Sequence, residues 1–325
     1  MINPLVITRD VHFASSVILA GILSFDAFIA APVLQWKSPL NATLSRFRGT
    51  TRKILLPCLG VSIASAIVWL CLLSIRIAGR PLEEVIADGT IWTVVAHTQF
   101  GLAWTLRLLL ALLLAASLLP RREIKTGATD RLGMLSILLA CLYLGLLAFG
   151  GHGEEGLGFA RYIHLAVDFL HLVAAGLWLG GLVSLAILLV YLPRSGEELW
   201  VTAACRAGGR FSTLGIFVVA ILVVSGIINA TFLVGEIQNL TGTQYGRWLM
   251  LKLALFAAMI CMAAVNRWRL VPWLCSGRGS ANSFPAVQWL VRLTMLEFIL
   301  GVGIILIVGT LGIMAPATEM VSHVH

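Results

Sequence analysis

Two histidines and an aspartate lie within an apolar stretch of the sequence, residues 162–192. His164, Asp168 and His171 are spaced by four and three residues, so an α-helix would place all three on one face. Ionisable side chains in a membrane are costly and normally face a bundle interior or a water-filled path. Because imidazole and carboxylate are common ligands of transition metals, the spacing predicts a metal site. A hydrogen-bonded network that joins helices is the structural alternative.

The composition indicates the environment of these residues. Hydrophobic residues make up 59% of the chain and charged residues 12%, whereas soluble domains average about 45–50% and about 25%. We therefore expect an all-α fold, a polytopic transmembrane helical bundle of about eight helices, each long enough to cross a bilayer. The expected membrane helices cover residues 11–35, 54–75, 92–119, 132–150, 162–192, 213–234, 248–268 and 289–310. No connection is long enough for a further domain, so we expect one integral membrane domain over residues 1–325.

The distribution of charge predicts the orientation. Lys and Arg gather in the connections after the first, third, fifth and seventh expected helices, and positively charged loops stay in the cytoplasm. Both termini are therefore expected in the periplasm. The formal net charge of +8 is explained by this topology and by contact with anionic membrane lipid, so a nucleic-acid partner is not needed.

Two further histidines are expected near the outer end of the cluster. His12 begins the first expected helix and could share the depth of His164, and His152 lies in a glycine-containing outer turn. A metal ion arriving from outside would meet His152, His12 and His164 first. Asp168 could ligate the metal, orient a ligating imidazole or pair with Arg107 of the third expected helix.

Two carboxylates are expected deeper in the membrane. Asp26 follows His12 by fourteen residues, and Glu297 lies eight residues into the last expected helix. Both would lie in the inner half of the bilayer, where they could pass a cation or protons inward. Snorkelling or an ion pair is the alternative for each.

The soft ligands of the chain form no clear motif. The six cysteines, Cys58, Cys71, Cys141, Cys205, Cys261 and Cys275, are scattered singly, and we interpret them as small packed residues without a disulfide framework. Met320, His323 and His325 at the C-terminus could capture metal outside the membrane.

An ordered set of residues carries a family resemblance. The set is Gly151, His152, His164, Asp168, His171, Ala174, Ala175, Trp178, Gly180, Gly181 and Leu182, then Phe211, Ser212, Gly226, Asn229, Thr243, Tyr245, Gly246, Lys252, Asn266, Arg267, Glu297 and Pro316. With these residues the chain resembles the CopD family of bacterial copper-resistance membrane proteins. The resemblance is strongest over residues 150–316 and looser in the first half, where His12 and the eight-helix plan carry it.

The resemblance implies copper handling at the bacterial inner membrane. It implies movement of copper ions from periplasm to cytoplasm, with a separate periplasmic copper chaperone of the CopC type as a partner; a homo-oligomer is possible. The sequence has no GxxxxGK[ST] phosphate loop, and we expect no enzyme activity. A monovalent cation moving inward gains about 2.3 kcal/mol per 100 mV of membrane potential.

Two other functions fit parts of the sequence. Paired transmembrane histidines can ligate b-type haem, and His12, His97, His164 and His171 could supply axial ligands for electron transfer. That function requires facing pairs at one depth, whereas His164 and His171 would share a face of one helix. A copper-binding sensor or assembly factor that does not transport is the other alternative.

Overall fold

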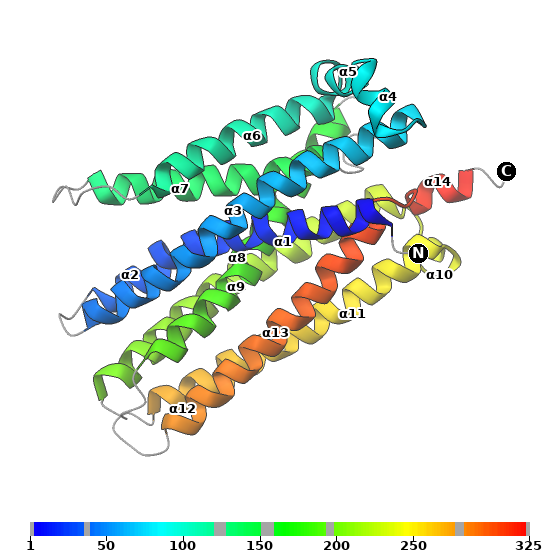
Figure 1. Ribbon diagram of the computed structural model, residues 1–325. Helices are drawn as coiled ribbons and strands as arrows, with labels where there is room; N and C mark the ends of the chain where they lie inside the picture. The colour runs from blue at the N-terminus through cyan, green and yellow to red at the C-terminus, as the bar shows by residue number, and fades with distance from the viewer. Residues whose placement is uncertain are drawn as a thin grey trace.

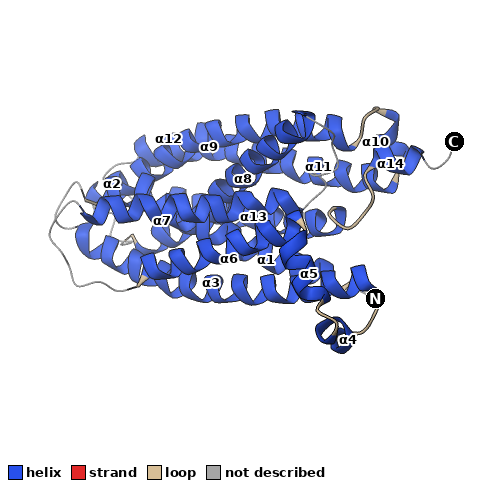
Figure 2. Cartoon of the chain, turned by 90° about the horizontal axis from the view of Figure 1, so that it is seen from above, coloured by secondary structure: helices blue, strands red, loops and turns tan. Residues whose placement is uncertain are grey.

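The chain folds into a bundle of long helices. The computed structural model describes residues 3–35, 40–119, 128–150, 159–192, 198–276 and 283–322, and every regular element in these ranges is helical (Figures 1 and 2). The spans long and apolar enough to cross a membrane are Pro4–Leu34, Asn41–Ala78, Gln99–Leu118, Leu132–Gly150, Phe159–Tyr191, Glu198–Leu233, Gln244–Ser276 and Pro285–Leu311. The expectation of an all-α bundle with eight membrane helices is confirmed.

The individual elements follow this plan with short interruptions. In chain order they are α1 (Pro4–Phe25), η1 (Asp26–Ala30), α2 (Ala31–Leu34), α3 (Asn41–Ala78), α4 (Leu82–Ala87), α5 (Thr90–His97), α6 (Gln99–Leu118), α7 (Ala128–Gly145), η3 (Leu146–Gly150), α8 (Phe159–Tyr191), α9 (Glu198–Leu233), α10 (Gln238–Gly242), α11 (Gln244–Val265), η5 (Asn266–Leu270), α12 (Val271–Ser276), α13 (Ser283–Leu311) and α14 (Ala317–Ser322). The π-helical turns η1 and η5 continue α1 and α11 without ending the span.

The third expected helix is broken, which the hydropathy pattern did not predict. Thr98 is extended, with φ −118° and ψ 153°, and its hydroxyl caps α6 by accepting a hydrogen bond from the Gly101 amide at 2.9 Å. A Cβ on Gly101 would collide with the backbone of Val94 and Val95 in α5. The short α5 therefore folds back onto the start of α6, and the expected helix 92–119 is wrong at its beginning.

Helix α8 occupies the centre of the bundle and packs most extensively on α1 and α9. Glycines make its contact with α1 unusually close, because a Cβ on Gly21 would collide with the backbone of Gly176 and Gly180. Small residues let the backbones of membrane helices approach one another in this way. The glycines of residues 176–180 therefore set the position of α8 and of the polar residues in its first half.

Both chain ends lie at the same end of the bundle, and α2 and α12 lie at the other (Figures 1 and 2). This agrees with an even number of membrane crossings. The end that holds the termini is called the outer end below, and the end that holds α12 the inner end. The assignment of these ends to periplasm and cytoplasm rests on the charge of the loops.

One prediction about the cysteines is wrong. Cys205 of α9 and Cys275 of α12 form a disulfide, with their Cα atoms 5.2 Å apart, although 70 residues separate them in the sequence. The packing of α12 against α9 brings them together, and no spacing motif reveals such a contact. The other four cysteines are free thiols.

Candidate functional site

A cavity of about 410 Å³ lies towards the outer end of the bundle, between α1, α8, α9, α11 and α13. Its wall is largely apolar, with side chains such as Phe13, Leu222 and Phe256. The polar side chains that line it are Arg9, His164, Asp168, His171, Asn229, Tyr245 and Lys252. The three residues of the predicted cluster on α8 therefore share one cavity, as expected from their common helix face.

His171 is held in one tautomer by α9. Its Nδ1 lies 2.8 Å from the Ser225 hydroxyl oxygen, and that hydroxyl donates its own proton to the Ile221 carbonyl at 2.5 Å. Because a hydroxyl has a single proton, the Ser225 oxygen must accept from Nδ1–H. The lone pair of the imidazole is then on Nε2, which is the arrangement that a metal-ligating histidine requires.

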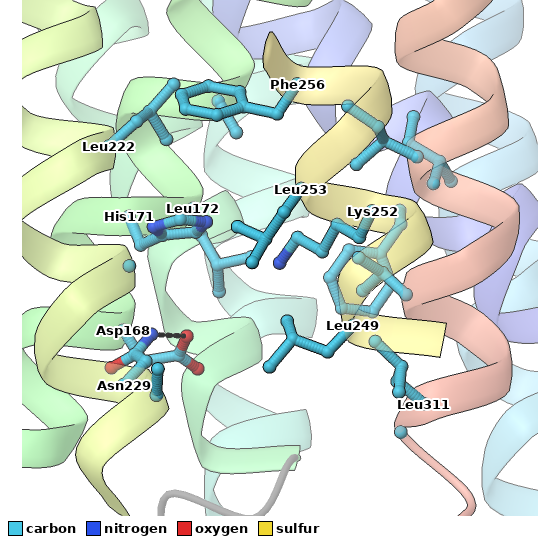
Figure 3. Close-up of a pocket in the computed structure, with 18 of the residues that line it drawn as sticks. Asp168, His171, Leu172, Leu222, Asn229, Leu249, Lys252, Leu253, Phe256 and Leu311 are labelled. Carbon is cyan, nitrogen blue, oxygen red and sulfur yellow. Dashed lines mark hydrogen bonds between the residues drawn. The ribbon is translucent and has the colours of Figure 1, made fainter. Parts of the chain in front are cut away.

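Asp168 lies one turn before His171 and is oriented by the same neighbouring helix. Asn229 of α9 donates from Nδ2 to Asp168 Oδ1 at 3.1 Å (Figure 3). Ser225 and Asn229 are four residues apart on α9, so they form two polar steps that match His171 and Asp168 on α8. These contacts fix the positions of the two candidate ligands relative to each other.

Lys252 of α11 is a cation that faces this pair. It extends from α11 into the space beside Asp168 and His171 (Figure 3), and its charge acts on both residues. Arg107, the expected alternative partner of Asp168, instead donates to the Tyr143 carbonyl at 2.9 Å and to His12. The structure therefore gives that alternative no support.

His164 forms the outermost step on α8. Its ring is buried and stacks on Phe232 of α9, with 4.6 Å between ring centroids and 10° between planes. Within the part of the chain that the structure describes, no three His, Cys, Asp or Glu side chains are grouped closely enough to hold one metal ion. The cavity therefore offers ligands in succession along α8 and not as one preformed cage.

His12 belongs to a separate polar cluster between α1, α3 and α6. It is fully buried, with Nδ1 2.9 Å from the Ser62 carbonyl oxygen and Nε2 2.5 Å from Arg107 Nη2. Both ring nitrogens are therefore engaged. The structure does not bring His12 to the side of His164 in the cavity, because α1 presents Arg9, Phe13 and Val17 there.

The two deeper carboxylates have different surroundings. Glu297 is 1% exposed and accepts from Asn266 Nδ2 at 2.5 Å and from the Trp178 side chain. Trp178 also lines the cavity, so Glu297 lies directly behind the cavity wall. Asp26 accepts from Arg48 Nε with both oxygens, at 3.0 and 3.1 Å, which is the ion pair named above as its alternative.

Several predicted site residues lie outside the ranges that the structure describes. His152, His323 and His325 are not among the described residues, and neither is the side chain of Met320.

The sequence interpretation missed Arg9, which lines the cavity, and Ser225, which contacts His171. Ser225 gave no signal beyond its spacing from Asn229. Arg9 was placed before the first helix, but α1 begins at Pro4 and buries Arg9, which donates to the Gly312 carbonyl at 2.5 Å. The sequence analysis named Asn229 and Lys252 only as residues that carry the family resemblance. An isolated amide or amine side chain does not by itself identify a binding site.

Comparisons with known proteins agree on one family. Residues 205–311 match the family model described as copper resistance protein D, and residues 1–162 match the one described as copper resistance protein D-like, N-terminal domain. Residues 163–204 lie between the two matches, whereas Asn229, Lys252 and Glu297 lie within the match to copper resistance protein D. No solved structure matches the chain.

Three curated relatives support the assignment. Copper resistance protein D of Pseudomonas syringae pv. tomato is 33% identical over 223 residues, 67% of this chain and 70% of that protein. Inner membrane protein YebZ of Escherichia coli (strain K12) is 28% identical over 312 residues, 95% of this chain and 97% of that protein. Copper transport protein CutJ of Bacillus subtilis (strain 168) is 28% identical over 189 residues, 58% of this chain and 34% of that protein. The chain is thus a multi-pass protein of the bacterial inner membrane, and it belongs to the copper resistance protein D family.

Proposed function

We propose that this protein moves copper ions from the periplasm to the cytoplasm and that the outer cavity is the first intramembrane binding site. The observation that carries the proposal is the His171–Ser225 hydrogen bond, which leaves the imidazole lone pair on Nε2, in a ring one helical turn from Asp168. Copper is the metal that the family membership favours. The chain's relatives named for copper resistance and copper transport support the same metal.

In this proposal the ion is passed along α8. His164 meets it nearest the outer end, and Asp168 and His171 hold it one and two turns deeper. His152 belongs to the proposed approach path. His12 could join that path only by exchanging Arg107 for the metal, because Arg107 now contacts its Nε2.

Lys252 supplies the charge balance. An ammonium group beside Asp168 offsets the carboxylate when copper is absent, and an arriving copper ion adds positive charge at the same place. The metal therefore displaces Lys252 as the counter-charge of Asp168. This arrangement stabilises the empty cavity, so it weakens copper binding and favours release of the ion.

The inward route passes Trp178 and Glu297, the carboxylate behind the cavity wall. Asp26 lies nearer the inner end and could take part once it separates from Arg48. The membrane potential favours inward movement of a cation by about 2.3 kcal/mol per charge and 100 mV. A separate periplasmic chaperone of the CopC type would deliver the ion.

Uptake into sealed liposomes tests this function. Purified protein is reconstituted with a copper-sensitive dye inside, and wild type is compared with His164→Ala/His171→Ala and with His97→Ala, whose exposed side chain lies at the end of α5. We expect rapid uptake by wild type and His97→Ala and a large loss in the double variant. Copper binding without uptake by wild type would instead indicate a sensor or assembly factor.

The haem alternative is tested on the same preparation. An intense Soret band in the absorption spectrum would overturn the copper proposal. The structure favours copper because His12, His97 and the pair on α8 occupy three separate places, with different neighbours.

A further inference from the structure

A pair of cysteines lies at the inner end of the bundle, remote from the cavity. Cys205 is near the start of α9 and Cys275 is near the end of α12, with Cα atoms 5.2 Å apart. Leu222 of α9 lines the cavity, and the helical rise between it and Cys205 is about 26 Å. The two sulfurs are therefore separated from the outer ligands by most of a membrane thickness.

The compartment expected at this end keeps cysteines reduced. The basic connections after the fifth and seventh helices, which flank these two residues, predict a cytoplasmic location. Disulfides are rare in the cytoplasm, where a close cysteine pair is more typical of metal binding or redox chemistry. Reduction by a cellular dithiol transfers two electrons and two protons, breaks the S–S bond and yields two thiols with a disulfide as the other product.

The surroundings would shield an ion bound to these cysteines from water. Cys205 is 8% exposed, and the flanking residues Ala204 and Leu274 are buried, which limits access of water to the sulfurs. Arg206 follows Cys205 directly but is exposed, whereas Cys205 is buried, so the bound metal itself would have to displace the thiol protons. Thiolates are soft ligands that select Cu(I).

From this juxtaposition we infer that reduced Cys205 and Cys275 form a two-thiolate Cu(I) site at the inner end of the protein. The inference rests on the proposed role in copper movement and adds its exit site. Cu(I) replaces both thiol protons, so the bis-thiolate complex carries one net negative charge and two protons are released.

Polar groups at intermediate depth connect the two sites. Asn266, which holds Glu297, precedes Cys275 on the same continuous span by about 14 Å of helical rise. Copper that passes Glu297 would therefore reach the cysteine pair before it leaves the bundle. The soft pair would take Cu(I) from harder oxygen and nitrogen ligands and present it to cytoplasmic thiols.

Titration with Cu(I) tests the inference. Full-length protein is reduced with a dithiol, freed of reductant without oxygen and titrated against a chromophoric Cu(I) chelator. We expect Cys205→Ser/Cys275→Ser to lose one Cu(I) equivalent and its ultraviolet thiolate-to-copper band, with at least a hundredfold weaker retention. Cys58→Ser/Cys261→Ser, which removes two free thiols elsewhere, should keep both signals.

The cavity variant separates this inference from the proposed function. His164→Ala/His171→Ala should lose the cavity equivalent and keep the thiolate band if the two sites are distinct. If wild-type protein shows the thiolate band but binds no copper at the cavity, the proposed function is overturned and the cysteine site stands. An unchanged Cu(I) count in Cys205→Ser/Cys275→Ser would overturn the cysteine site.

A measurement on the wild-type protein covers the case of a variant that does not fold. Reduced protein is treated with a maleimide, with and without one equivalent of Cu(I), and labelling of each cysteine is read by mass spectrometry. We expect Cu(I) to protect Cys205 and Cys275 together and to leave Cys58 labelled equally in both samples. Equal labelling of the pair with and without Cu(I), or a disulfide that persists in intact bacteria, would contradict the site.

Discussion

Ser225 accepts a hydrogen bond from His171 Nδ1 at 2.8 Å while donating its proton to the Ile221 carbonyl. Replacing Ser225 with Ala removes the acceptor that sets the tautomer of His171. We expect a 10- to 100-fold loss of copper affinity at the cavity, which is the range for partners that orient ligating histidines. Competition titration measures it, with Ser184→Ala as the control because Ser184 bonds within α8 to the Gly180 carbonyl. Equal affinities for the two variants would contradict the role of the hydrogen bond.

Lys252→Met is expected to increase copper affinity. The substitution removes a positive charge that acts on Asp168 and His171, and relief of this repulsion is worth on the order of 1–2 kcal/mol, roughly tenfold. Lys252→Arg keeps the charge and should bind as wild type does within a few fold. The same titration measures both variants, and weaker binding by Lys252→Met would show instead that the amine ligates the metal.

Glu297→Gln is expected to separate binding from transport. The amide keeps the shape of the side chain beside Asn266 and Trp178 but removes the carboxylate from the proposed route. Uptake into liposomes should fall at least tenfold, which corresponds to a loss of about 1.4 kcal/mol in stabilisation of the passing cation. Cavity affinity should change by less than about twofold, because Glu297 does not line the cavity. Glu236→Gln, an exposed site after α9, is the control, and undiminished uptake by Glu297→Gln would exclude a relay through this residue.

His12→Ala tests whether this histidine is structural. The substitution leaves the buried Arg107 without the contact to Nε2 and the Ser62 carbonyl without its Nδ1 donor. We expect a loss of about 2–4 kcal/mol in the free energy of unfolding, measured by thermal or denaturant unfolding in detergent, with the copper count unchanged. Loss of one copper equivalent in a stably folded variant would show that His12 exchanges Arg107 for copper.

Gly180→Ala tests the packing that positions α8. A Cβ there would approach the Val17 carbonyl and Gly21 of α1 too closely, so α1 and α8 must separate. Overpacking of this kind costs about 1–3 kcal/mol, occasionally more. Gly215→Ala on α9, where a Cβ meets nothing within 4 Å, should leave the unfolding free energy unchanged or slightly higher, and equal stability of the two variants would contradict the close contact.

The helix boundaries show which parts of the fold could be predicted. Hydropathy located all eight spans, but α3 begins at Asn41 and α9 at Glu198, well before residues 54 and 213. The early turns of both helices contain arginines, so these turns are helical but lie outside the apolar segment that hydropathy detects. The break at Thr98 was missed because Thr98 and Gly101 act through a cap and a close backbone contact, which hydropathy does not measure.

Composition and helical periodicity are local properties of the chain, so they were enough to predict the membrane environment, the number of membrane helices and the common face of His164, Asp168 and His171. The contacts between helices could not be predicted in this way: Ser225, Asn229 and Lys252 surround that face, His12 contacts Arg107, and Cys205 is bonded to Cys275. Membrane helices are apolar on all sides, so hydropathy does not distinguish a surface that faces lipid from one that faces another helix. Close contacts such as that of Gly21 with Gly180 determine which helices pack together. The packing of the helices then determines which ionisable groups lie close enough to act together.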